Sequence, residues 1–115
     1  MRLHIIIPVI NEAENLRGLL PFLYAELSGN GQITVADGGS TDGTETVVAQ
    51  APGTRHLRCH RCGRAQQMNE AAALNQEEFD VVYFVYADTR LPQGFYQDIK
   101  ESVNAGFSVG CYRFN

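Results

Sequence analysis

Two long apolar segments dominate the hydrophobic pattern of this chain: residues 3–10 (LHIIIPVI) and residues 79–88 (FDVVYFVYAD). Continuous apolar runs of this length are typical of strands buried on both faces, as in a parallel sheet. Shorter strand-like segments occupy residues 33–37 and 55–59, and a last one occupies 107–115. The pattern therefore predicts five strands.

Segments with helical spacing separate these strands. Leucines recur at helical intervals from residue 16 to residue 27, with Asn11 as the expected N-cap and Glu14 completing a capping box. Pro21 lies inside that pattern, so we expect a kink or two shorter helices. Further helices are predicted from Ser40 or Thr41 to about residue 50, over residues 64–74, and after Pro92, where Phe95, Ile99 and Val103 share one face.

Alternating strands and helices predict an α/β fold with a mostly parallel sheet, flanking helices and right-handed crossovers. Ligands of such sheets bind at the carboxyl ends of the strands, where the strand order reverses. The loops that follow the strands are therefore the places to look for chemistry.

Composition narrows the class of protein. The 115 residues suffice for one domain, and the net charge of −4 without a basic block argues against a nucleic-acid partner. The apolar runs are far shorter than the roughly 20 residues of a membrane span. No signal-peptide pattern is found, and three cysteines are an odd count for a disulfide framework, so we expect a cytoplasmic protein.

Two of the loops carry an aspartate directly at a strand end. Asp37 is followed by Gly38 and Gly39, which would let a ribose or base approach closely, although the same residues also make an ordinary capped turn. Asp88 ends the second apolar strand, where it could bind a divalent cation on a diphosphate or cap the next turn. The sequence has neither a GxGxxG after the first strand nor a GxxxxGK[ST] loop, which argues against a dinucleotide fold and a P-loop.

Four segments in order, "IIIPVINEAENL", "VADGGSTDGT", "GRAQQMNEAA" and "VYADTRLP", resemble the N-terminal half of family 2 glycosyltransferases with the GT-A fold. The likeness is greatest to small bacterial members with an Ala-Asp-Thr metal motif. It implies a Rossmann-like half of a GT-A fold and an inverting, metal-assisted transfer of sugar from a nucleotide-diphospho-sugar to an unknown acceptor.

The resemblance also implies site residues. Pro8, Ile10 and Glu12 would line the nucleotide pocket, with Asp37, Gly38 and Gly39 near the base or ribose; Arg64 and Asn69 would lie near the diphosphate and sugar, and Ala87 and Asp88 would complete the donor site. Asp88 would hold Mn²⁺ or Mg²⁺.

Two positions depart from the family pattern. Many relatives have a second aspartate where this chain has Gly38, and many have Asp-x-Asp where it has Tyr86-Ala87-Asp88. The first change affects base preference, and the second leaves one certain carboxylate for the metal.

The chain is about half as long as the family's usual domains, so we expect residues 1–115 to hold the donor half without the acceptor half or the general base. No catalytic residue is assigned to this chain. An exposed last strand would then favour a homodimer, since unpaired edges pair with other chains. We also expect peripheral membrane association.

The alternative is a non-catalytic nucleotide- or metal-binding module. The stretch "RCHRCGR" contains Cys59 and Cys62, with His56 and His60 nearby, as in half of a zinc knuckle. Structural zinc needs four ligands, and the third cysteine, Cys111, is remote in sequence. The same stretch, through Gly63 and Arg64, instead leads into a helix whose N-terminus would bind phosphate. A nucleotidyltransferase would carry a Gly- and Lys/Arg-rich loop where this chain has the acidic "PVINEAEN".

Overall fold

The computed structural model describes residues 1–106. These residues form a four-stranded, all-parallel sheet with the strand order β3-β2-β1-β4. The elements in chain order are β1 (Leu3–Val9), α1 (Ala13–Leu27), β2 (Gly31–Asp37), α2 (Thr44–Ala49), β3 (Thr54–Arg58), α3 (Arg64–Ala72), the 3₁₀ turn η1 (Gln76–Glu78), β4 (Val81–Phe84) and α4 (Phe95–Asn104). The predicted parallel α/β fold is confirmed.

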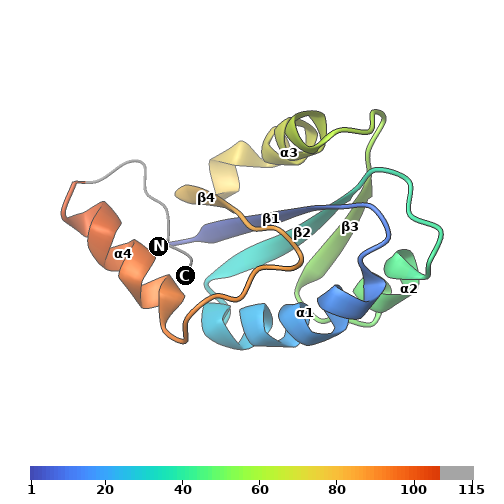
Figure 1. The fold of residues 1–115 in the computed structure, drawn as a ribbon. Coiled ribbons are helices and arrows are strands. Elements are labelled where there is room, and N and C mark those ends of the chain that lie inside the picture. Colours follow the sequence, from blue (N-terminus) through green and yellow to red (C-terminus); the bar gives the residue numbers. More distant parts are fainter. Residues whose placement is uncertain (107–115) are drawn as a thin grey trace.

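The helices cover the two faces of the sheet unequally. Figure 1 shows α3 alone on one face and α1 with α2 on the other. α4 follows β4 and packs on the side of α1, where the Phe95 ring lies 6.0 Å from Phe22 and 6.1 Å from Tyr83. The larger layer therefore lies on the α1 side.

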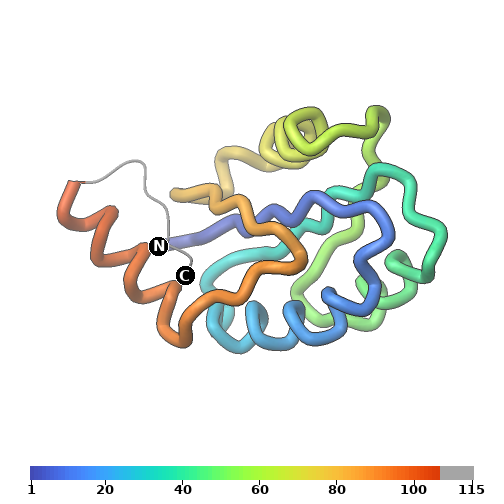
Figure 2. Tube along the Cα trace, viewed as in Figure 1, coloured from blue at the N-terminus to red at the C-terminus, as the bar shows by residue number. Residues whose placement is uncertain are grey.

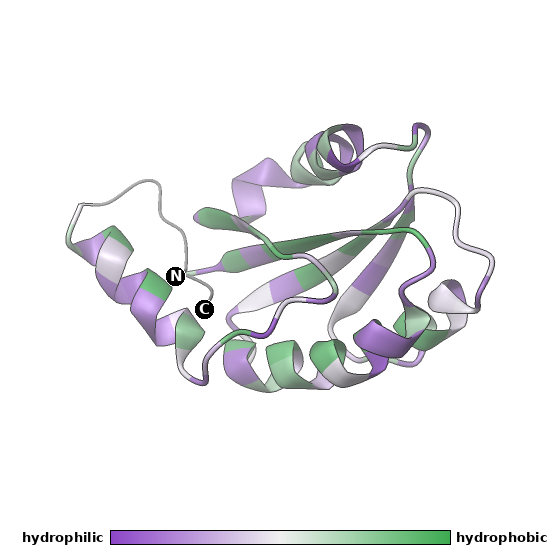
Figure 3. Cartoon of the chain, viewed as in Figure 1, coloured by the Kyte–Doolittle hydropathy of each residue, from purple (hydrophilic) through white to green (hydrophobic). Residues whose placement is uncertain are grey.

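The core follows from the alternation of side chains along β1. Ile5 and Ile7 point into the large cluster under α1 and α2, whereas Ile6 joins a small cluster under α3. All seven residues of β1 are buried, which is the reason for its continuous apolar sequence. Figure 3 shows hydrophobic residues along β1 and β4, and hydrophobic and hydrophilic residues alternating along α1.

Helix starts were predicted less well than strands. The predicted Asn11 cap is wrong: Glu12 is the N-cap of α1, no side chain of its own caps it, and Asn11 takes a left-handed backbone conformation with φ 56°. Of the two alternatives expected at Pro21, a kink or two shorter helices, the second is wrong, because one helix runs through that residue. α2 begins only at Thr44, after Gly43, and neither Ser40 nor Thr41 caps it.

β4 differs from its prediction in length and burial. It covers four residues and alternates between half-buried and exposed positions, with Val82 and Phe84 39% and 45% exposed. Within residues 1–106 it is an edge strand, and α3 packs mainly on β1 and β2. β4 is therefore less buried than its continuous apolar sequence predicted. The predicted last strand and the dimer contact through it lie outside the described residues.

No helix in residues 1–106 is long and apolar enough to cross a membrane.

Candidate functional site

A pocket of about 300 Å³ opens at the carboxyl edge of the sheet, between β1 and β4. From β1 the chain adds β2 and β3 on one side and then returns to place β4 on the other, so this is the point where the strand order reverses. Sites of parallel α/β sheets lie at such points. The lining residues come from β1 and its loop, from the start of α3 and from the loop after β4: Pro8, Val9, Ile10, Glu12, Cys62, Gly63, Arg64, Gln67, Tyr86, Ala87 and Asp88.

Pro8 explains why the sheet opens here. The Ile6 carbonyl accepts a hydrogen bond from the Val85 N–H at 2.9 Å, so the backbone of every second residue of β1 faces β4. The next such residue is Pro8, which has no N–H to pair. The pairing of β1 with β4 accordingly ends at Ile6 and Phe84, whereas β1 stays paired with β2 through Val9. The gap beyond Ile6 forms the pocket.

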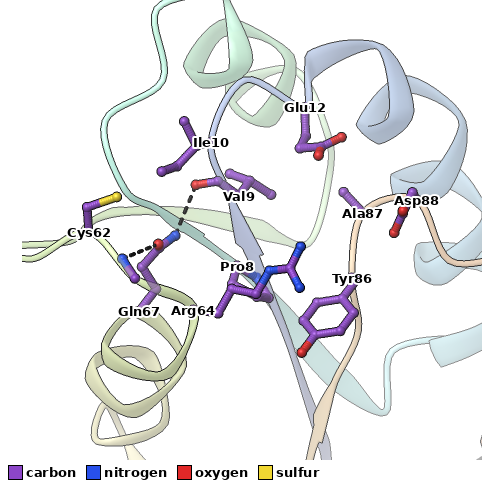
Figure 4. Close-up of a pocket in the computed structure, with 11 residues that line it drawn as sticks. Pro8, Val9, Ile10, Glu12, Cys62, Arg64, Gln67, Tyr86, Ala87 and Asp88 are labelled. Carbon is purple, nitrogen blue, oxygen red and sulfur yellow. Dashed lines mark hydrogen bonds between the residues drawn. The ribbon is translucent and has the colours of Figure 1, made fainter.

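Gln67 ties the walls of the pocket together. Its side chain is 2% exposed, and its amide nitrogen donates to the Val9 carbonyl at 3.0 Å and to the Ala36 carbonyl at 2.8 Å. Its amide oxygen accepts from the Gly63 N–H at 3.0 Å. Figure 4 shows the bond to Val9. One side chain thus joins the ends of β1 and β2 to the turn before α3.

Two glycines make room for this arrangement. A Cβ on Gly38 would lie 2.8 Å from the Gln67 amide oxygen, which is closer than side chains tolerate. Gly63 takes φ 137°, a backbone conformation that L-residues rarely adopt. The turn before α3 therefore brings Gly63 and Arg64 to the wall of the pocket.

The start of α3 presents positive charge to the pocket. Gly63 supplies no side-chain cap, and the N–H groups of Arg64, Ala65 and Gln66 find no acceptor among residues 1–106. The Arg64 guanidinium carbon lies 4.6 Å from the centre of the Tyr86 ring. No ion pair of Arg64 is found in the described part of the chain. Its charge and the free N–H groups are available to an anion.

Two carboxylates lie on the side of the pocket away from α3 (Figure 4). Glu12 accepts a hydrogen bond from the Asn15 side chain at 2.7 Å. Asp88 is exposed and accepts no hydrogen bond from any described residue. With Arg64, these groups give the pocket lining a formal charge of −1.

The loop after β2 is organised differently. Asp37 is 3% exposed and accepts hydrogen bonds from the Gly39 N–H at 2.9 Å, the Ser40 N–H at 2.8 Å and His56 Nε2 at 2.8 Å. Burial acts to raise the pKa of Asp37, but the hydrogen bonds from His56, Ser40 and Gly39 outweigh it and lower the pKa. Both oxygens of the Asp37 carboxylate thus accept hydrogen bonds from within the fold.

The same loop holds the start of α1 in place of the predicted capping box. Ser40 Oγ accepts from the Asn11 N–H at 2.8 Å, and Asn11 Oδ1 accepts from the Thr41 N–H at 2.7 Å. Asp42 accepts from the Ala13 N–H at 3.1 Å, and the Thr44 hydroxyl and this N–H lower the pKa of its carboxyl. These bonds fix the loop after β1, which carries Ile10 and Glu12.

The cysteines and histidines of "RCHRCGR" do not converge. His56 bonds to Asp37, while His60 bonds to Glu70. Burial, followed by the neighbouring Glu70, raises the pKa of Cys59 to about 12, so its thiol is protonated at neutral pH. Among residues 1–106, no group of three or more His, Cys, Asp or Glu side chains is arranged to hold a metal ion. The half-knuckle pattern therefore has no four-ligand site within this part of the chain.

The pocket gathers six of the ten residues expected from the sequence: Pro8, Ile10, Glu12, Arg64, Ala87 and Asp88. The other four, Asp37, Gly38, Gly39 and Asn69, do not line it; Asn69 is exposed on α3. Sequence reasoning assigned no role to Gln67 or Tyr86. Gln67 belongs to the "GRAQQMNEAA" segment. It shares the buried face of α3 with Ala71, and a polar residue at such a position indicates a side chain that bonds within the fold.

Two comparisons with known proteins bear on the identity of the chain. No curated protein gives a significant match to it. A family model described as glycosyl transferase family 2 matches residues 4–114, nearly the whole sequence. With its parallel α/β sheet and a pocket at the point of strand reversal, the chain belongs to glycosyl transferase family 2.

Proposed function

We propose that this chain binds a nucleotide-diphospho-sugar in the pocket between β1 and β4 and serves the transfer of its sugar to an acceptor. The observation that carries the proposal is that Arg64, from α3, and Asp88, from the loop after β4, line one pocket, and that neither has a charged partner in residues 1–106. The diphosphate would lie against Arg64 and the free N–H groups of α3. Membership of the family supports a sugar donor.

A divalent cation, Mn²⁺ or Mg²⁺, fits the charges of the pocket. A lining of formal charge −1 repels a diphosphate, and one divalent ion reverses its sign. Magnesium uses one or two carboxylates together with water and phosphate oxygens, so a cage of three protein ligands is not needed. Asp88 would hold the ion, with Glu12 on the same side of the pocket. When bound, the ion would stabilise the negative charge of the departing nucleoside diphosphate.

The proposed reaction is a single displacement with inversion. The acceptor oxygen bonds to the anomeric carbon while the bond from that carbon to the diphosphate breaks, and a general base takes the proton of the acceptor hydroxyl. Arg64 and the N–H groups of α3 would hold the leaving diphosphate in place. We assign the base and the acceptor site to no residue of this chain.

Residues 1–115 are therefore proposed as the donor-binding portion of the transferase domain. Gly38 is part of this proposal: at the position where many relatives carry a second aspartate, the Gln67 amide fills the space. Base recognition would then rely on other groups. Cytoplasmic location, peripheral membrane association and the homodimer remain predictions from the sequence.

A thermal-shift panel of UDP-, GDP-, dTDP- and CDP-sugars, with and without Mn²⁺, tests the proposal. Binding to the folded state alone at 100 times the Kd stabilises a protein by about 2.7 kcal/mol, so a donor should raise the Tm measurably. One nucleotide class should do so only with Mn²⁺, and Asp88→Asn should abolish the shift. Glu77→Gln, an exposed carboxylate outside the pocket, is the matched control. The proposal would be contradicted if none of the donors raised the Tm, or if the donor raised the Tm of Asp88→Asn as much as that of the wild type.

A further inference from the structure

We propose that Tyr86 is a positioning residue that holds the Arg64 guanidinium over the pocket for the diphosphate, an inference that rests on the function proposed above. The guanidinium carbon of Arg64 lies 4.6 Å from the centre of the Tyr86 ring, within the range of a cation–π contact. Both side chains line the pocket. They reach it from opposite sides, Arg64 from α3 and Tyr86 from the loop after β4 (Figure 4).

The contact with the Tyr86 ring holds the Arg64 guanidinium in the absence of an ion pair. No ion pair holds this exposed side chain within residues 1–106, and a free arginine side chain samples many rotamers. A ring beneath the guanidinium restricts that freedom before any anion arrives. Less ordering is then needed on binding, which raises affinity.

A neutral ring also preserves the charge that the site needs. A carboxylate at position 86, as in the Asp-x-Asp motif of many relatives, would lie beside Arg64 and neutralise it. Tyr86 orients the guanidinium by its π face and leaves all of its N–H donors for phosphate oxygens. The departure at position 86 thus gives the diphosphate a preoriented cation where relatives offer a second acidic group.

The backbone at Arg64 is held in place by contacts that do not involve the guanidinium. Gln67 Oε1 accepts from the Gly63 N–H at 3.0 Å, and Gln67 also bonds to Val9 and Ala36. The backbone before Arg64 is therefore anchored to β1 and β2. Loss of the Tyr86 ring should free only the guanidinium and leave the helix start unchanged.

The contact can be measured in the ligand-free protein. In NMR spectra the Arg64 Hδ signals should be shifted upfield by the Tyr86 ring, should remain so in Tyr86→Phe and should move to ordinary positions in Tyr86→Leu. Arg64→Met identifies the signals by their loss. Ordinary Arg64 shifts that Tyr86→Leu leaves unchanged would overturn the inference.

The consequence for binding can be measured with inorganic pyrophosphate and Mn²⁺ by isothermal titration. Tyr86→Leu should weaken binding about 3- to 10-fold, and Tyr86→Phe should stay within about twofold of wild type, given the usual strength of cation–π contacts. In the Arg64→Met background, Tyr86→Leu should cause no further loss. Phe84→Leu, a similarly exposed ring at the end of β4 that does not line the pocket, is the control and should bind as wild type.

The two proposals fail in different ways. An equal loss from Tyr86→Leu with and without Arg64 would show that the ring contacts the ligand directly, and it would overturn the positioning role. Tight pyrophosphate binding unaffected by Tyr86→Leu would overturn this inference alone. No pyrophosphate binding by the wild-type protein would overturn the proposed function and this inference with it.

Discussion

The loop after β2 and the pocket beside β4 both place polar side chains at the carboxyl edge of one sheet, but they use them differently. In the loop, Asp37 accepts bonds from two backbone N–H groups and His56, and Asp42 accepts from the start of α1. In the pocket, Asp88 and the N–H groups at the start of α3 have no hydrogen-bond partner among residues 1–106, and the Arg64 guanidinium lies over a neutral ring without an ion pair there. The polar groups of the loop stabilise the fold, whereas those of the pocket are free to bind a ligand.

This difference separates residues that sequence alone ranks equally. The sequence places both Asp37 and Asp88 at the end of an apolar segment, and both belong to the motifs that resemble the family. Buried polar groups are costly unless they are satisfied within the fold, so full satisfaction of Asp37 is a sign of a structural role. An exposed carboxylate without a partner costs little and can bind a ligand.

The largest effect on folding is expected from Gln67→Leu. The change removes three hydrogen bonds and leaves the buried Ala36 carbonyl and the half-buried Gly63 N–H without this partner. Each such group costs about 1–3 kcal/mol, so the free energy of unfolding should fall by about 3 kcal/mol. Urea denaturation measures it. Gln66→Leu, an exposed neighbour, should cost much less, and equal losses in both variants would refute the role of Gln67.

Asp37→Asn should cost about 2 kcal/mol at neutral pH, since hydrogen bonds to charged groups contribute 1.5–3 kcal/mol. The pKa of folded Asp37 lies below its ordinary value of 3.8, so its contribution is complete above that pH and is lost as the pH falls through the folded pKa. The wild type and the variant should therefore converge in stability under acid conditions. Asp88→Asn is the matched control and should leave stability unchanged; a gap between Asp37→Asn and wild type that persists in acid would contradict this account.

Gly38→Ala is expected to have a smaller effect. Its Cβ would lie 2.8 Å from the Gln67 amide oxygen, which must then shift and weaken its bonds. We expect a loss of about 1–2 kcal/mol, comparable with other overpacked sites. Gly18→Ala, inside α1 with open space around it, should stabilise by about 0.5–1 kcal/mol. Thermal denaturation compares the two, and effects of the same sign would argue against the close approach of Gly38 to Gln67.

The smallest effects are expected at the cysteines. Cys62 is exposed, whereas the pKa of Cys59 is about 12, so in a Cys111→Ser background a thiol reagent should label Cys62 first. Mass spectrometry after labelling at mildly alkaline pH measures the order. Cys62→Ser should leave both stability and metal content unchanged. Faster labelling of Cys59, or stoichiometric zinc that Cys62→Ser removes, would restore the metal-binding alternative.

The sequence predicted the fold more completely than the contacts inside it. Continuous apolar runs identify buried parallel strands because burial on both faces requires them, and this placed β1 and the loops at the ligand edge. It overestimated β4, because an edge strand and a central strand can share the same composition. The caps were missed because Ser40 and Asp42 act on the start of α1 across about 29 residues, and no local pattern encodes such a contact.

The site was predicted in part for the same reason. Arg64 and Asp88 follow from motif and position at strand ends. The division between Asp37 and Asp88 depends on where N–H groups and His56 lie in space, which spacing along the chain does not show. Tyr86 could be recognised as a partner of Arg64 only once α3 and β4 were placed on opposite sides of one pocket.

The most direct test of the pocket as an anion site is isothermal titration of UDP, GDP, dTDP and CDP, each with and without Mn²⁺. We predict that at least one binds, that removal of Mn²⁺ abolishes binding, and that Arg64→Met and Asp88→Asn each weaken it by about tenfold or more. Both variants should retain the wild-type Tm. Binding of none of the four, or wild-type affinity in both variants, would contradict the assignment of these unpaired charges to a diphosphate.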